Sequence, residues 1–212
     1  TVTATDLVGN TSSATEVGTL EVDTQAPVLS NVAVNADRFS LIGTHADISV
    51  SFVSNEDLAT APLVVMGETT FDCSDDYTAN ATITCTHTLT TDDVASGEEL
   101  IRSIVITGAD AAGNTVGESV SVTLDAKVPV LLSSPISPES AKLGDEVVLS
   151  LAFDEELGQV PLLSGDLTFS HDADSQYTYS LTVTSDIAND SYAFTVTATD
   201  LVGNTSSATE VG

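Results

Sequence analysis

The sequence contains no tryptophan, only 4 tyrosines and 6 phenylalanines, and only 4 lysine and arginine residues in 212. A phosphate backbone must be neutralised by basic side chains, so a nucleic-acid partner is excluded. The chain is also poorly supplied for a platform of exposed aromatic rings, such as a sugar-binding module would use. No apolar run approaches the length of a membrane span and no signal peptide is recognisable, so we expect no membrane insertion within these residues.

Acidic residues, by contrast, are abundant. The 32 aspartates and glutamates give a formal net charge of -28 at pH 7. Self-repulsion of this size destabilises a compact state unless salt or bound cations offset it. Two interpretations stay open for the bulk of the charge: adaptation to a saline medium, or specific binding of Ca²⁺.

The sequence repeats itself. Residues Thr1 to Gly18 return without a change as Thr195 to Gly212. A looser copy, Ile104 to Pro129, aligns with Val2 to Pro27 in the order strand, D-x-x-G-N turn, strand, aspartate, short linker and proline. Such self-similarity indicates a tandem array, whose units of roughly a hundred residues have an ordinary domain size.

These repeats divide the chain into three parts. We expect residues 1–25 to be the last hairpin, strands F and G, of a preceding repeat, with strands over 1–5 and 11–22. Residues 26–126 then form a complete domain, and residues 127–212 form a second domain whose final strand is truncated. Pro27 and Pro129 end short linkers, and each fixes its own φ and holds the preceding residue extended.

Short alternating segments bounded by turn residues predict strands, and seven in about a hundred residues predict a β-sandwich. In the complete domain we expect strands A to G over 28–34, 46–54, 63–66, 69–73, 81–90, 101–107 and 118–124. In the second domain we expect strands over 130–133, 146–153, 161–163, 167–170, 177–184 and 192–199, and a last one after Asn204. The residues expected to point inward include Ile48, Val50, Phe52, Ile83, Ile104 and Ile106.

The two cysteines, Cys73 and Cys85, are predicted to point inward on neighbouring strands. A disulfide there would add ~2–4 kcal/mol and would indicate an oxidising, extracellular setting. A pair of buried free thiols is the alternative. The matching positions of the second domain are taken as His171 and Ser185, so the bridge is not essential to the fold.

The turn A-x-D-x-x-G-N, followed by a strand and by V-D-T-x-A-P, resembles the bacterial immunoglobulin-like (Big or cadherin-like) tandem repeats of giant secreted surface adhesins. The resemblance implies an all-β chain of tandem seven-stranded immunoglobulin-like Greek-key β-sandwiches in an elongated array. It also implies an extracellular or cell-surface stalk, often with calcium between domains. It supplies no ligand for the distal end.

Strand order predicts where the acids gather. If strand A starts next to the preceding domain, the B–C, D–E and F–G loops all return to that pole, where the linker aspartate also arrives. Among the acidic residues expected there, those of the linker, B–C and F–G segments are the preferred candidate ligands. Less favoured candidates are the D–E loop residues Asp75, Asp76, Asp172 and Asp174. The candidate metal ligands are Asp23, Glu56, Asp57, Asp110 and Asn114 at the first junction, and Asp125, Asp154, Glu155, Glu156, Asp200 and Asn204 at the second.

Oxygen ligands from several loops suit Ca²⁺, which takes six to eight of them. The competing interpretation is that Asp6, Asp110 and Asp200 only cap their hairpins and that the other acids are solvated charges. No catalytic motif is present, and His45, His87 and His171 stand alone in sequence, so we expect no enzyme.

Three functions remain to be weighed. The first is a structural extender that holds a binding module away from a surface and is stiffened by Ca²⁺ at its junctions, with neighbouring repeats as its partners. The second is a subunit of an extracellular filament or sheath, in which identical subunits donate the strand Gly18 to Asp23 to one another. The third is an accessory binding domain of a secreted enzyme.

Overall fold

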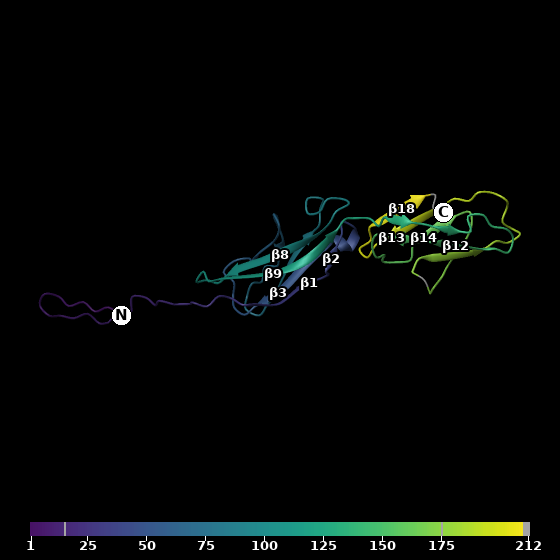
Figure 1. Ribbon diagram of the computed structural model, residues 1–212. Coiled ribbons are helices and arrows are strands. Elements are labelled where there is room, and N and C mark those ends of the chain that lie inside the picture. Colours follow the sequence, from purple (N-terminus) through teal and green to yellow (C-terminus); the bar gives the residue numbers. More distant parts are fainter. Residues whose placement is uncertain (15, 175, 210–212) are drawn as a thin grey trace.

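The computed structural model describes residues 1–14, 16–174 and 176–209. Figure 1 shows two β-sandwiches arranged end to end, preceded by an extended N-terminal segment. We call the strands between residues 29 and 125 the first sandwich and those between 131 and 209 the second sandwich. Among the described residues, no helix has the length and apolarity needed to cross a bilayer.

Two sheets form the first sandwich. One contains β1 (Leu29–Val34), β3 (Asp47–Ser54), β7 (Thr82–Thr88) and β6 (Asp72–Cys73), in the order β1-β3-β7-β6. The other contains β2 (Arg38–Phe39), β9 (Thr115–Asp125), β8 (Glu99–Ala109), β4 (Leu63–Met66) and β5 (Thr69–Thr70), in the order β2-β9-β8-β4-β5. A short 3-10 helix, η1 (Gly43–Ala46), precedes β3. The strands β1, β3, β7 and β6 correspond to A, B, E and D, and β4, β8 and β9 correspond to C, F and G. The orders A-B-E-D and C-F-G define the immunoglobulin Greek key, so the predicted immunoglobulin-like fold is confirmed.

Period-two alternation explains these strands. In β3 every second residue is buried, and the residues between are exposed or half-buried. The two sheets thereby present one apolar face each to a shared core. All six residues expected to point inward are fully buried: Ile48, Val50, Phe52, Ile83, Ile104 and Ile106.

The second sandwich repeats this topology with shorter strands. They are β10 (Leu131–Ser133), β11 (Ile136–Ser137), β12 (Glu146–Ser150), β13 (Ala152–Phe153), β14 (Leu162–Gly165), β15 (Ser170–His171), β16 (Thr178–Thr182), β17 (Phe194–Thr199) and β18 (Thr205–Thr209). They pair in the orders β10-β13, β11-β12-β16-β15 and β14-β17-β18.

Two predicted strands are divided in the structure. The segment 69–73 splits because Phe71 turns into the core, so that β5 pairs with β4 while β6 pairs with β7 in the other sheet. The segment 146–153 splits at Leu151, whose amide donates to the carbonyl oxygen of Tyr177. At both places the predicted single strand is divided into two short strands, and each of these pairs with a different sheet.

Of the predicted N-terminal hairpin, the turn at Asp6 to Asn10 forms, but the two strands expected over 1–5 and 11–22 do not form among the described residues. Asp6 accepts the amides of Val8 and Asn10 through Oδ1, and Thr5 and Thr11 form an isolated bridge, but the described residues of this segment form no strand. Every described residue from 1 to 26 is exposed. A two-stranded ribbon without a sheet to pack against is marginal in water, which accounts for the missing strands.

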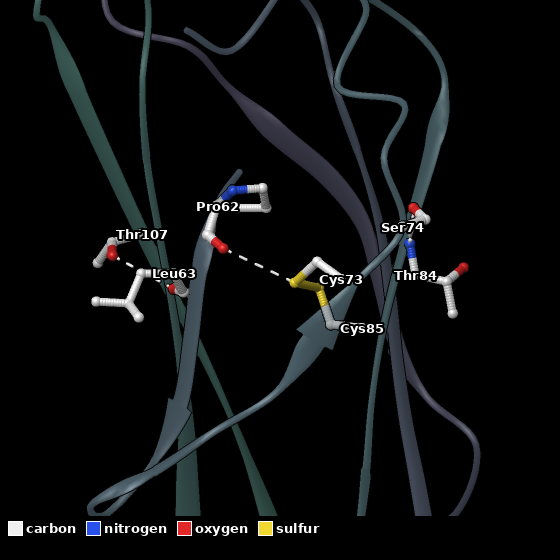
Figure 2. Close-up of a disulfide and its surroundings, with 7 residues drawn as sticks. All are labelled: Pro62, Leu63, Cys73, Ser74, Thr84, Cys85 and Thr107. Atoms are coloured by element: carbon white, nitrogen blue, oxygen red, sulfur yellow. Dashed lines mark hydrogen bonds between the residues drawn. A yellow bond between two sulfur atoms is a disulfide. The ribbon is translucent and has the colours of Figure 1, made fainter. Parts of the chain in front are cut away.

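The cysteines form a disulfide between β6 and β7, in which Cys73 is paired directly with Cys85 (Figure 2). Cys85 is fully buried, and the Sγ atom of Cys73 lies 3.7 Å from the carbonyl oxygen of Pro62. The matching pair in the second sandwich is His171 and Tyr179, whose ring centroids are 5.3 Å apart. Tyr179 therefore occupies the position of Cys85. The expected match to Ser185 is wrong, because the register of β15 and β16 pairs His171 with Tyr179.

We predict that reduction will destabilise only the first sandwich. The disulfide closes a loop within that sandwich, so its loss should lower the free energy of unfolding by about 2–4 kcal/mol. Calorimetry with and without reductant should show one transition moving to lower temperature and the other staying in place. The double variant Cys73→Ser, Cys85→Ser should reproduce the reduced trace, and an equal shift of both transitions would contradict this assignment.

Candidate metal centres at the two junctions

Both linkers adopt the same local turn. Asp23 accepts the amide of Gln25 through Oδ1 at 3.0 Å, and Asp125 accepts the amide of Lys127 through Oδ1 at 3.1 Å. The proline that ends each linker is buried. Each linker aspartate is thus placed in a defined position in front of the sandwich that follows it.

The F–G turns of the two sandwiches hold a second aspartate in each junction. Asp110 accepts the backbone amide of Asn114 at 2.9 Å and its side-chain amide at 2.8 Å. Asp200 accepts the same two groups of Asn204 at 2.9 and 2.7 Å. Gly113 and Gly203 supply the positive φ that these turns require.

The asparagine of each turn also ties the linker to it. The side-chain amide of Asn204 donates to the carbonyl oxygen of Asp125 at 2.9 Å, and that of Asn114 donates to the carbonyl oxygen of Asp23 at 3.4 Å. Each asparagine therefore acts in this structure as a donor that brings two aspartates together.

A glutamate from the B–C loop completes each cluster. At the first junction, carboxylate oxygens of Asp23, Glu56 and Asp110 all lie within 4.8 Å of one another. At the second, carboxylate oxygens of Asp125, Glu155 and Asp200 do the same. We call these sets the first and second acidic clusters. Each takes one residue from each of the three segments that the sequence analysis ranked highest.

Burial makes the second cluster electrostatically costly. Asp125 is only 1% exposed and Asp200 only 4%. The Oε1 atom of Glu155 is buried and has no hydrogen-bond partner. Burial first, and then the charges of Asp125 and Asp200, raise the pKa of Glu155 to about 7. The same causes, with Asp23 and Asp110 as the charges, raise the pKa of Glu56 at the first cluster.

This donor set suits a divalent cation bound by oxygen. Three carboxylates converge, and the buried Oε1 atom of Glu155 has no hydrogen-bond partner, so a bound cation would satisfy it. Hard oxygen ligands favour Ca²⁺ or Mg²⁺ over transition metals, and ligands from several separate loops suit the irregular coordination of Ca²⁺ better than the strict octahedron of Mg²⁺. The clusters contain no histidine or cysteine.

The other predicted ligands lie outside the clusters, for local reasons. Asp57 accepts the amide of Ala79 at 2.7 Å, which ties the B–C loop to the D–E loop. Asp154 accepts the amide of Val130 at 2.7 Å and pairs with the Lys127 ammonium at 2.5 Å, which lowers the pKa of Asp154. Glu156 is exposed.

The D–E acids are engaged elsewhere as well. Asp76 accepts the amide and the hydroxyl of Thr78, and Asp172 accepts the amide of Asp174. These residues shape their own loops and do not reach the acidic clusters. The lower rank that the sequence analysis gave them agrees with this placement.

The sequence analysis did not identify the roles of two basic residues at the second junction, Arg38 and Lys127, nor one direct contact between the two sandwiches. Arg38 pairs with Asp125 at 2.7 Å and with Glu99 at 2.8 Å, so the second cluster is partly neutralised by the protein itself. The hydroxyl of Ser40 donates to the carbonyl oxygen of Val202 at 2.9 Å. Ser40 and Val202 are both buried, so the F–G turn of the second sandwich packs against the end of the first.

Comparisons with known proteins support the fold and leave the family open. No family model matches the chain, and no curated protein matches it. Fifteen chains of solved structures match, among them a glutamate-to-alanine variant of three consecutive immunoglobulin domains of titin, at a TM-score of 0.50 and 12% identity. The match covers 88% of this chain and 65% of the titin fragment. At this identity the likeness concerns the immunoglobulin-like fold alone.

We predict an inverted pH dependence of stability in the absence of divalent cations. The pKa of Glu155 is raised in the folded chain from 4.5 to about 7, so between these values the folded state binds more protons than the unfolded state. The free energy of unfolding therefore falls as pH rises through this window. The variant Glu155→Gln should lose this fall and exceed the wild type by roughly 1–3 kcal/mol at pH 8.

The measurement is urea unfolding in chelator between pH 5 and pH 8, followed by tyrosine fluorescence. Three of the four tyrosines, Tyr177, Tyr179 and Tyr192, lie in the second sandwich. Glu156→Gln is the matched control because it removes the same charge from the exposed neighbouring residue. Equal pH profiles for Glu155→Gln and the wild type would show that Glu155 does not carry the effect.

Proposed function

We propose that this chain consists of structural extender repeats of a secreted or cell-surface adhesin, in which Ca²⁺ stiffens each junction. The observation that carries the proposal is the buried, unpartnered carboxylate oxygen of Glu155 between Asp125 and Asp200. The same three-residue cluster recurs one repeat earlier. The immunoglobulin-like fold, shared with a protein built of consecutive domains, supports the coarser assignment to a structural role.

A bound cation would act by joining carboxylates from three segments: the linker, the B–C loop and the F–G turn. The linker aspartate belongs to the end of one repeat, whereas the B–C glutamate and the F–G aspartate belong to the next sandwich. Neutralising their mutual repulsion would fix the linker against both loops and thereby fix the angle between consecutive sandwiches. The contact between Ser40 and Val202 would then be held in place at the second junction.

The affinity needed is modest. Extracellular calcium modules work at Kd values of ~10⁻⁴–10⁻³ M, matched to the calcium of body fluids or sea water. At a calcium concentration ten times Kd, one site that binds only the folded state contributes about 1.4 kcal/mol. Two such sites would offset part of the self-repulsion of a chain with net charge -28.

One other function, and one other interpretation of the charge, fit the structure less well. All 10 phenylalanine and tyrosine residues are buried or half-buried, so an accessory domain that binds sugars through exposed rings lacks its platform. Adaptation to salt explains a high net charge but does not require three carboxylates to converge with one oxygen unpartnered. No catalytic role is proposed.

We predict that millimolar Ca²⁺ raises the melting temperature and lengthens the particle, while NaCl at matched ionic strength has a much smaller effect on both because it only screens the charge. Calorimetry and small-angle scattering measure the two effects. The double variant Glu56→Gln, Glu155→Gln should lose both responses, since it removes one carboxylate from each acidic cluster without touching a turn or linker hydrogen bond.

The matched control is Asp57→Asn, Glu156→Gln, which removes the same charge from the adjacent residues and should respond to calcium like the wild type. Mg²⁺ should act weakly, because it demands a stricter octahedral geometry. A response of equal size to NaCl would sink the calcium proposal and leave general screening as the explanation. A response retained by the cluster variant would place the calcium elsewhere.

A further inference from the structure

One short segment of the first sandwich touches two separate parts of the second junction. The guanidinium of Arg38 donates to the Oδ2 atom of the linker residue Asp125 at 2.7 Å. Two residues later, the hydroxyl of Ser40 donates to the carbonyl oxygen of Val202 in the F–G turn at 2.9 Å. We call residues 38–40 the clamp segment, because it holds the linker and the F–G turn at the same time.

The clamp segment is itself anchored in the first sandwich. Its central residue, Phe39, is 1% exposed and pairs in parallel with Leu124 of β9. The amide of Ser40 donates to the carbonyl oxygen of His45 at 2.9 Å, and its hydroxyl oxygen accepts the amide of Ile42 at 3.2 Å. These bonds fix the position of the hydroxyl and leave its proton for the acceptor in the second sandwich.

The acceptor of the Ser40 hydroxyl belongs to the same turn as a cluster carboxylate. Val202 follows Asp200 by two residues, and its amide donates to the Oδ1 atom of Asp200 at 2.8 Å. Val202 is 3% exposed, whereas its neighbour Leu201 is 53% exposed. Hydrogen bonds on both sides of Val202 therefore connect the first sandwich to the carboxylate of Asp200.

The remaining carboxylate is fixed to this turn within the second sandwich. Gly158, three residues after Glu155, donates its amide to the carbonyl oxygen of Thr199 at 3.0 Å. A Cβ atom on Gly158 would overlap the carbonyl oxygen of Asp200, so glycine is needed for the B–C loop to approach the turn this closely. The second sandwich by itself thus sets the spacing between Glu155 and Asp200.

The two contacts of the clamp segment differ in what they do to a bound cation. Arg38 brings a positive charge to Asp125 and also pairs with Glu99, so its removal would change both charge and geometry. Ser40 is uncharged and is not a member of the acidic cluster, so it acts on a cation through position alone. Ser40 is therefore the residue that separates positioning from electrostatics.

We propose that the clamp segment positions the second acidic cluster for cation binding, so that docking of the two sandwiches and occupation of the cluster favour each other. The inference rests on the proposed function and adds a residue of the preceding sandwich that sets the affinity. Docking brings the linker and the F–G turn together before the cation arrives, so less ordering has to accompany binding. By reciprocity, a bound cation strengthens the docking by the same factor.

The test uses two variants that loosen the docking from opposite sides. Ser40→Ala removes the hydroxyl from the first sandwich, and Val202→Ala shortens the buried side chain of the second. Alanine suits this turn, because Ala112 occupies the same place in the F–G turn of the first sandwich. The matched control is Leu201→Ala, which shortens the exposed neighbour in the same turn.

Calcium affinity is measured by titration calorimetry in the background Glu56→Gln, so that only the second cluster keeps its three carboxylates. We expect Ser40→Ala and Val202→Ala to raise Kd roughly five-fold or more, and Leu201→Ala to leave it unchanged. Residual dipolar couplings report the relative orientation of the two sandwiches. In chelator they should show a wider spread of orientations for Ser40→Ala than for the chain with Ser40, and calcium should narrow both.

The first acidic cluster provides an internal control. Asp110 lies just before β9 and Asp125 ends this strand of 11 residues, so roughly 35 Å separates the two clusters. In the background Glu155→Gln, where only the first cluster is complete, Ser40→Ala should leave the calcium Kd unchanged. A general loss of stability in the first sandwich would instead weaken the first cluster, which belongs to the same sandwich as Ser40, and spare the second.

Three results would overturn the proposal, and each has its own meaning. If the Glu56→Gln chain takes up no calcium, the proposed function fails at this junction and the clamp segment has no cation to position. Calcium uptake with one Kd for the background, Ser40→Ala and Val202→Ala refutes the clamp alone and leaves the calcium proposal standing. A first cluster weakened by Ser40→Ala as much as the second shows a loss of stability in place of positioning.

Discussion

The repulsion among three carboxylates at one end of each sandwich is the constraint on which the junctions depend. Asp125, Glu155 and Asp200 come from a linker, a B–C loop and an F–G turn, and the immunoglobulin strand order delivers all three to the same pole. Hydrogen bonds from Asn204 hold the two aspartates in place, so the repulsion cannot be relieved by a small movement of the backbone. Protonation of Glu155 would relieve the repulsion, and so would the bound cation that we propose, which would also add to the hydrogen bonds that hold the linker.

The repulsion among the carboxylates is neutralised by basic side chains to different degrees at the two junctions. At the second junction Arg38 pairs with Asp125 of the cluster, and Lys127 pairs with Asp154 beside it. These two residues are half of the 4 lysine and arginine residues of the chain. The second junction also has the packed contact between Ser40 and Val202. At the first cluster Asp23 is exposed, and among the described residues no basic side chain pairs with it. The first cluster therefore lacks a basic partner for its linker aspartate, whereas the second holds more buried charge.

The sequence predicted the fold and the location of the site because both follow from periodicity and strand count. Alternation placed Ile48, Val50 and Phe52 in the core, and counting strands placed the linker, B–C and F–G acids at one pole. It could not select within N-E-D and D-E-E, where side-chain direction decides. The middle glutamate points into each cluster, while the first residue accepts the backbone amide just before the first strand of its own sandwich. Aligning the two loops would have shown that only this glutamate is common to both. The contact between Ser40 and Val202 depends on packing between distant segments, which no local sequence pattern predicts. The same holds for the absence of strands among the described residues of the segment 1–26.

The most direct test of the account is a crystal structure of the chain grown with calcium and measured with anomalous scattering. The account predicts one cation in the second acidic cluster, with carboxylate oxygens of Asp125, Glu155 and Asp200 about 2.3–2.6 Å away. A cluster that holds only water, or the Lys127 ammonium, with the Glu155 side chain turned out to solvent, would contradict it.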